Sequence, residues 1–166
     1  MEMPEFEERE DNRQGHTSLK QHVLEQVNLL NFSQIDRLIA HCIVDALDDK
    51  GFLDETLEEV LEAVQHLLDQ MDYEEEVELD EVAVVLKHIQ RLDPLGVGAR
   101  NLVECLYIQL DVLPQHTFAR PEALMLLKHY ELLIANDLNK LIKQTGFKLE
   151  QLKSGIELLK TLQAYP

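Results

Sequence analysis

The 166-residue chain contains no tryptophan and only five phenylalanines and four tyrosines. This low aromatic content, together with many Leu, Val, Glu and Lys residues, is typical of a helical bundle. No apolar run approaches the ~18 residues that a membrane-spanning helix needs, so we expect no transmembrane segment. The start of the chain, Met1-Glu2-Met3-Pro4-Glu5, also lacks the basic and then apolar layout of a secretion signal. These absences favour a cytoplasmic helical protein.

Cysteine is scarce as well, since only Cys42 and Cys105 occur. Both lie on apolar stripes with helical spacing, which predicts two reduced and buried thiols; a disulfide between them is the alternative. A nucleophilic pair of Cys105 with a distant histidine is a second alternative, but the apolar stripe favours a core thiol. The histidines show no spacing typical of zinc sites. We therefore expect no catalytic residue, metal or cofactor, and no enzyme activity.

Positive charge is missing from one long segment, because no Lys or Arg occurs from Gly51 to Leu86. Residues 1–86 carry 5 Lys/Arg and 24 Asp/Glu, whereas residues 87–166 carry 10 and 8. Such an acidic surface repels a phosphate backbone, so we do not expect this chain alone to bind DNA. A basic protein partner fits better, since complementary charges steer association. A solvated acidic surface that only maintains solubility is the alternative.

Apolar residues recur with helical spacing through most of the chain, which predicts an all-α fold of about eight helices. The expected helices cover Leu19–Leu30, Ile35–Leu47, Leu57–Met71, Val82–Leu92, Leu102–Leu113, Glu122–Ala135, Leu138–Gln144 and Leu149–Leu162. Capping residues are expected at Ser18 with Gln21, at Ser33, at Thr56 with Glu59 and near Asp80, and Gly51 is expected to end the second helix.

These helices suggest two packed helical subdomains behind an acidic tail. Residues 1–16 are acidic, nearly free of apolar side chains and predicted to be disordered. Residues 17–113 are predicted to form the first subdomain, a four-helix unit followed by a bridging helix. Residues 114–166 are predicted to form a smaller three-helix subdomain. No alternation of strands and helices is present, which excludes a parallel sheet.

The last two predicted helices, separated by Gly146, have the layout of a helix-turn-helix. Its candidate recognition residues are Lys148, Glu150, Gln151, Lys153 and Ser154. Packing around a glycine turn is much commoner than DNA recognition, so the structural role is favoured over the DNA-binding one.

The most informative segment is Leu92–Arg100, which we call the signature corner. Pro94 disfavours helical geometry at the residue before it and so ends the preceding helix. Gly96 and Gly98 permit a positive φ, and the apolar residues between them favour burial over a solvent-exposed linker. We therefore predict a buried corner between two helices. Asp93 is expected to accept backbone N–H groups or to pair with Arg100. Such contacts give the corner a structural role, and direct contact with a partner is the alternative.

The stretch Leu86–Leu106 resembles the central signature of the bacterial sigma-54 factors, the enhancer-dependent sigma subunits of RNA polymerase. A second stretch, Asp36-Arg37 followed by Ile43–Leu53, is similar to another motif of that family. The signature matches at Asp93, Pro94, Gly96, Val97, Ala99, Arg100, Leu102, Glu104, Cys105 and Leu106. The resemblance covers about Thr17 to Pro166, although the closing Leu162–Pro166 departs from the family pattern.

The resemblance implies the core-binding region of a transcription-initiation factor, which docks the factor on core RNA polymerase. In that family an N-terminal region responds to an ATP-dependent activator, and a C-terminal region recognises promoter DNA; both are expected to be missing here, so we expect the chain to be a fragment. We predict that the acidic surface between Asp54 and Glu81, with Glu58, Glu59 and Glu62, docks a basic polymerase surface. The alternative function is a stand-alone helical adaptor or an anti-sigma-like decoy.

Overall fold

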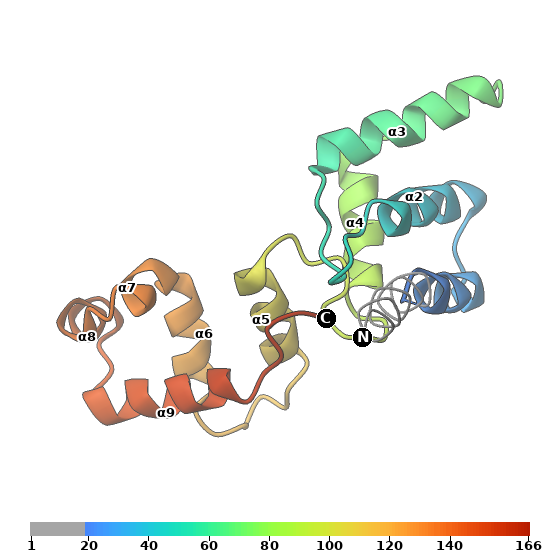
Figure 1. Cartoon of the computed structure of the whole chain (residues 1–166). Helices are drawn as coiled ribbons and strands as arrows, with labels where there is room; N and C mark the ends of the chain where they lie inside the picture. Colours follow the sequence, from blue (N-terminus) through green and yellow to red (C-terminus); the bar gives the residue numbers. More distant parts are fainter. Residues whose placement is uncertain (1–18) are drawn as a thin grey trace, which may run out of the picture. The chain divides into compact units, whose positions relative to one another are not determined.

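The computed structural model describes residues 19–166, and helices joined by loops make up this part of the chain (Figure 1). Residues 19–29 form the first helix. It is followed by α2 (Gln34–Asp45), α3 (Leu57–Gln70), α4 (Leu79–Ile89), α5 (Leu102–Asp111), α6 (Arg120–Lys128), α7 (Tyr130–Ile134), α8 (Leu138–Thr145) and α9 (Leu149–Lys160). Within this range the β-type pairing is a single bridge between Leu47 and Leu53. The all-α prediction is confirmed, with nine helices in the described part instead of about eight.

The described chain separates into two compact units. The first unit comprises residues 19–100 with Pro166, and the second unit comprises residues 101–165. Helix α5 packs against α6 within the second unit, whereas the sequence pattern placed this helix with the first subdomain. The predicted acidic tail over residues 1–16 and the predicted cap at Ser18 lie outside the described residues.

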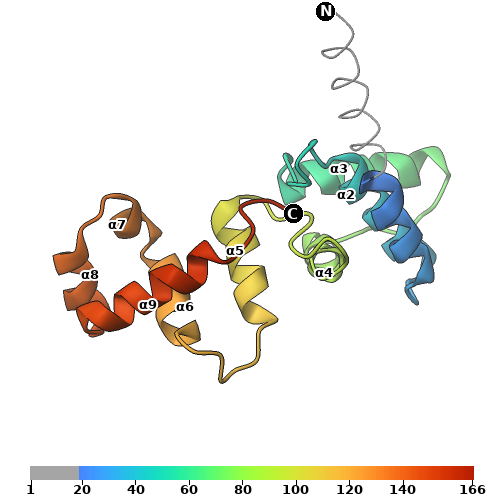
Figure 2. The ribbon, with the colours of Figure 1, turned by 60° about the horizontal axis from the view of Figure 1, so that its bottom comes forward.

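The first unit is built from the helix 19–29 and α2, α3 and α4, as the four-helix pattern predicts. Its core consists of fully buried aliphatic side chains from all four helices, among them Val23, Val27, Ile39, Ile43, Val60, Val64, Val82 and Ile89. In Figure 2, which looks along α4, the other three helices lie around it. These contacts fix the ends of the helices and therefore the loops between them.

Two of the predicted caps are present and two differ. The Ser33 hydroxyl accepts a hydrogen bond from the Asp36 N–H at 3.1 Å, and Thr56 forms the predicted capping box with Glu59. The cap of α4, which is expected near Asp80, is Glu78, two residues earlier. The prediction that Gly51 ends α2 is wrong, because α2 ends at Asp45 and Gly51 lies within the loop that the Leu47–Leu53 bridge closes.

In the second unit, one predicted helix is broken into two. The expected helix Glu122–Ala135 begins earlier, at Arg120, and is split at His129, which has the non-helical dihedral angles φ −113° and ψ 39°. The break turns Leu132 and Leu133 of α7 towards the cluster that includes Leu126, Leu141 and Leu152. Neither glycine nor proline marks this position, so the pattern alone gives no signal for it.

No helix in the described part of the chain is long and apolar enough to cross a membrane.

Candidate partner-binding site

The two sequence motifs meet in the first unit through backbone hydrogen bonds. The Gly98 N–H donates to the Gly51 carbonyl at 2.8 Å, and the Leu53 N–H donates to the Ala99 carbonyl at 2.9 Å. The loop between Leu47 and Leu53 is itself held by the Asp48 carboxylate, which accepts the N–H groups of Lys50 and Phe52. The motif residues 48–53 and the signature corner therefore form one structural element, although α3 and α4 separate them in the sequence.

The centre of the signature corner is buried, as predicted. Gly96, Val97, Gly98 and Ala99 are all buried, and Val97 belongs to the core of the first unit. Gly96 and Gly98 have φ values of +89° and +84°. Residues other than glycine adopt this backbone conformation only at an energetic cost. The two glycines thus let the chain reverse direction inside the core.

The start of the corner is bound to the helix 19–29. The Asp93 carboxylate lies 2.7 Å from His22 Nε2, and the Gln26 side chain makes two bonds with the Asp93 backbone, accepting its N–H at 2.9 Å and donating to its carbonyl at 2.6 Å. Sequence analysis missed His22 and Gln26, because nothing local to the helix 19–29 marks them as partners of a residue so distant in the chain. The Asp93 side chain itself is 81% exposed, so this end of the corner faces solvent.

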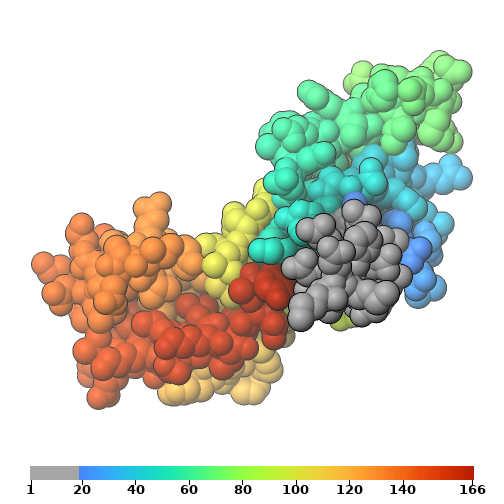
Figure 3. Space-filling view, in the orientation of Figure 1, coloured from blue at the N-terminus to red at the C-terminus, as the bar shows by residue number. Residues whose placement is uncertain are grey.

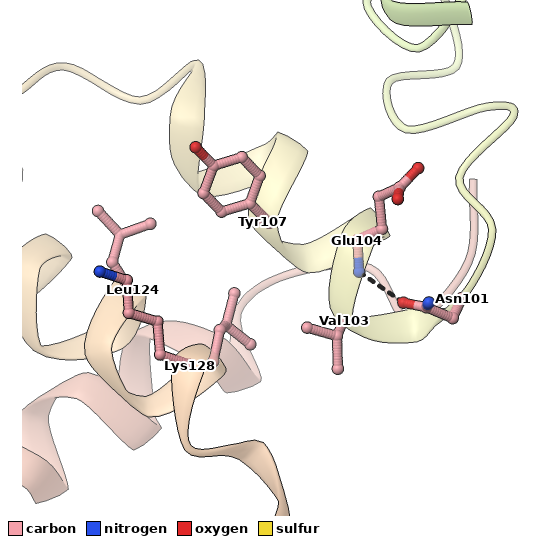
Figure 4. Close-up of a pocket in the computed structure, with 7 residues that line it drawn as sticks. Asn101, Val103, Glu104, Tyr107, Leu124 and Lys128 are labelled. Carbon is pink, nitrogen blue, oxygen red and sulfur yellow. Dashed lines mark hydrogen bonds between the residues drawn. The ribbon is translucent and has the colours of Figure 1, made fainter. Parts of the chain in front are cut away.

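The signature residues do not all belong to the first unit. Pro94 is half-buried and Arg100 is exposed, and both precede the boundary after residue 100. Leu102 and Glu104 are half-buried on α5 of the second unit. The Asn101 side chain caps α5 by accepting the Glu104 N–H at 2.9 Å (Figure 4). The signature therefore shapes the corner of one unit and the first helix of the next.

A pocket of about 540 Å³ lies between α5 and α6, next to the signature residues of α5. Figure 4 shows Val103 and Tyr107 of α5 on one side, and Leu124 and Lys128 of α6 on the other. Its lining combines the aliphatic Val103, Leu124 and Leu127 with the polar or charged Asn101, Glu104 and Lys128. The pocket thus sets an apolar wall beside polar groups, as ligand- and partner-binding hollows do.

The predicted acidic residues lie in the first half of α3. This helix lies at an outer edge of the first unit in Figure 3. Glu58, Glu59 and Glu62 are all exposed. Glu58 and Glu62 are one helical turn apart and lie on the side of α3 opposite the buried Val60 and Val64. Glu59 has a second role, because its carboxylate accepts the Thr56 N–H in the capping box at 3.3 Å. Glu58 and Glu62 are therefore the positions where charge can be changed without removing a cap.

The candidate recognition helix has the turn of a helix-turn-helix but uses several of its polar residues internally. The Gln151 side chain accepts the Lys148 N–H at 2.8 Å, and the Ser154 hydroxyl donates to the Glu150 carbonyl at 3.0 Å. The opposite face of α9 packs on α6, where Gly155 allows close approach. The two hydrogen bonds engage the side chains of Gln151 and Ser154, whereas Lys148, Glu150 and Lys153 remain exposed.

Both cysteines are free, in agreement with the predicted thiols. Cys105 is buried and Cys42 is half-buried. Burial raises the pKa of both thiols, and the negative charges of Asp45 and Glu55 raise the pKa of Cys42 further. Neither thiol is therefore activated as a nucleophile. Among residues 19–166, no group of three or more His, Cys, Asp or Glu side chains is arranged to hold a metal ion.

Comparison with known proteins identifies the domain. The sequence profile of the family described as "Sigma-54 factor, core binding domain" matches residues 8–166. The chain belongs to the sigma-54 factor family. It is the core-binding domain of such a factor.

Relatives in the sigma-54 family are similar over nearly the whole chain. The RNA polymerase sigma-54 factor of Acinetobacter guillouiae is 68% identical over 166 residues, which is 100% of this chain and 34% of the relative. The factor of Pseudomonas aeruginosa is 45% identical over 90% of this chain and 29% of the relative. The Escherichia coli factor is 39% identical over 92% and 31%, respectively. The chain thus spans about a third of the length of these relatives. Because the family match is to the core-binding domain of a sigma-54 factor, the alternative of an adaptor or anti-sigma-like decoy is not favoured.

Proposed function

We propose that this domain docks a sigma-54 factor on core RNA polymerase, and that the acidic outer face of α3 contributes to the contact. The observation that carries the proposal is the match of residues 8–166 to a core-binding domain, to which the structure adds an exposed acidic face. From Gly51 to Leu86 there are 13 Asp/Glu residues and no Lys or Arg. A surface of one sign raises the association rate with a partner of the opposite sign.

The signature corner supports docking indirectly in this proposal. Its centre, from Gly96 to Ala99, is buried and holds the motif loop in place, so only its ends are available to a partner. Asp93 and Arg100 are the exposed residues there. Promoter DNA and an ATP-dependent activator are, in the same proposal, contacted by regions of the factor outside these residues, and the complex operates in the cytoplasm.

The test compares two charge reversals that change the net charge equally. In one variant, Glu58→Lys and Glu62→Lys reverse the face of α3; in the control, Glu150→Lys and Glu157→Lys reverse two exposed residues of α9. Binding to core RNA polymerase from Acinetobacter guillouiae is followed by fluorescence anisotropy from low to high salt. The α3 variant should bind more weakly at low salt and show a flatter salt dependence, because it has lost the charges that salt screens.

The control should retain the wild-type salt dependence. Equal affinity of the α3 variant and the wild-type chain at low salt would contradict the electrostatic contribution of α3. Absence of wild-type binding at micromolar concentration and low salt would contradict docking by this domain.

A further inference from the structure

A groove along α2 of the first unit, bounded by α3 and at one end by Lys20 and Leu24 of the helix 19–29, is a second candidate interaction surface. It consists of two hollows, of about 290 Å³ and 420 Å³, that share the α2 residues Leu38 and His41. We call it the α2–α3 groove. Its lining extends from Gln34 to Asp45, which are the two ends of α2. At 1.5 Å per residue, this length corresponds to about three helical turns.

Large apolar side chains line the α3 side of the groove and remain exposed. Leu67 is 36% exposed and Met71 is 56% exposed, and the two lie one turn apart near the end of α3. Tyr73 follows at 40% exposure, on the same hollow as Met71. Contiguous exposed apolar groups beside a shaped hollow are typical of a protein-binding surface. The groove therefore offers an apolar floor with protruding contacts that the first unit does not itself cover.

The charge around the α2–α3 groove limits which partner it fits. From the last turn of α3 onwards lies an exposed acidic segment, whose charged residues are Asp69, Asp72, Glu74, Glu75 and Glu76. On the α2 side Arg37 lines one hollow, and Lys20, which lines the other, donates to the Asp45 carbonyl at 3.0 Å. At the other end the exposed Asp45 is accompanied by Lys20, so the excess of negative charge lies near the end of α3 and favours a partner with basic residues there.

A helix fits this groove better than an extended strand. Strand addition requires an exposed sheet edge, and residues 19–100 contain only the single bridge between Leu47 and Leu53. A groove between two helices instead accepts apolar side chains spaced at i, i+3 or i+4, and i+7. A second copy of this chain is a poor occupant, because residues 19–100 carry 19 Asp/Glu against 6 Lys/Arg and would repel one another.

We propose that the α2–α3 groove binds an amphipathic helix of core RNA polymerase. The apolar face of that helix packs on Leu38, Leu67 and Met71, and Lys or Arg residues beyond it face the acidic segment after α3. This assignment rests on the proposed function for the identity of the partner. It is separate from the acidic face of α3, since Glu58 and Glu62 point away from the core while Leu67 and Met71 line the groove.

The first experiment measures binding of the full 166-residue chain to core RNA polymerase by fluorescence anisotropy. The label is attached to the amino terminus, because Cys42 lines the groove. The test variant is Met71→Glu, and the control is Val84→Glu on α4, since these two side chains have nearly equal exposures of 56% and 55%. Both changes add one negative charge to the first unit at an exposed position, so neither should unfold it.

Met71→Glu should weaken binding by about tenfold or more, as expected for an apolar contact at the centre of an interface. Val84→Glu should leave the affinity within about twofold, as for a residue outside the interface. Equal effects of the two variants would overturn the groove while leaving the proposed function intact. Failure of the wild-type chain to bind at all would overturn both the groove assignment and the proposed function. The two outcomes are therefore distinguishable.

A second experiment identifies the occupant directly. The substitution Met71→p-benzoylphenylalanine places a photoactivatable group at the rim of the groove, and mass spectrometry locates the crosslinked peptide. The expected product is a polymerase peptide that is amphipathic, helical and flanked by Lys or Arg. A crosslink to a second copy of the chain, or to an extended polymerase segment, would overturn the proposal.

Discussion

Substitution of Gly98 by alanine tests whether the signature corner holds the first unit together. Gly98 has a φ of +84°, and forcing an alanine into this region costs about 1–2 kcal/mol. The added Cβ would lie 3.2 Å from Leu86 Cδ1 and 3.6 Å from Ile89 Cγ2. The closer atom is the end of a flexible side chain and can move, so most of the cost is backbone strain. For a unit of this size, such a loss lowers the melting temperature by about 4–16 °C.

The assay is thermal unfolding combined with hydrogen exchange, which reports on each unit separately. Gly98→Ala should lower the melting temperature and speed exchange of amides in the first unit, including the Leu53 N–H that bonds to Ala99. The matched control is Gly146→Ala in the second unit, where φ is +74° and no atom lies within 4 Å of the new Cβ. It should lower protection in the second unit only. An unchanged melting temperature and unchanged exchange for Gly98→Ala would refute the role assigned to the corner.

Three further perturbations have defined outcomes. Thr56→Ala should lower the free energy of unfolding by about 1 kcal/mol through loss of the α3 cap, measured by urea titration with circular dichroism; no change would contradict the capping role. Gly155→Ala should destabilise the second unit, because the new Cβ would lie 3.0 Å from the Ala123 backbone nitrogen. The overpacking costs about 1–3 kcal/mol, which exceeds the gain of about 1 kcal/mol in helix propensity. A higher melting temperature of the variant would contradict this. Since burial raises the pKa of Cys42 and Cys105, iodoacetamide should alkylate both thiols slowly in the native state and faster in urea. The free energy of unfolding should also fall as pH rises above the ordinary thiol pKa, because the unfolded chain then loses these protons before the native chain does.

Local features of the fold were predictable because their causes are local. The capping box at Thr56 and the cap at Ser33 depend on residues three positions away, and both are present. The burial of Val97 follows from an apolar residue between glycines in a turn. The break at His129 was not predictable, since it depends on how Leu132 and Leu133 pack on other helices.

The contacts that build the site depend on tertiary structure and left no mark in the sequence. His22 and Gln26 are ordinary polar residues on a helix, and only the folded chain brings them to Asp93. The two motifs were each recognised, but their direct bonding through Gly51 and Gly98 uses backbone atoms, which have no residue signature. The α2–α3 groove was likewise missed, because the spacing of Leu67 and Met71 places them on a stripe that resembles core.

The backbone bonds between the motif loop and the signature corner also constrain the order of folding. They join segments that lie on either side of α3 and α4, so the chain must close a long loop before it gains their stabilisation. Packing of the intervening helices shortens that search, and we expect the corner to form after the folding transition state. Weakening the corner should then accelerate unfolding much more than it slows folding.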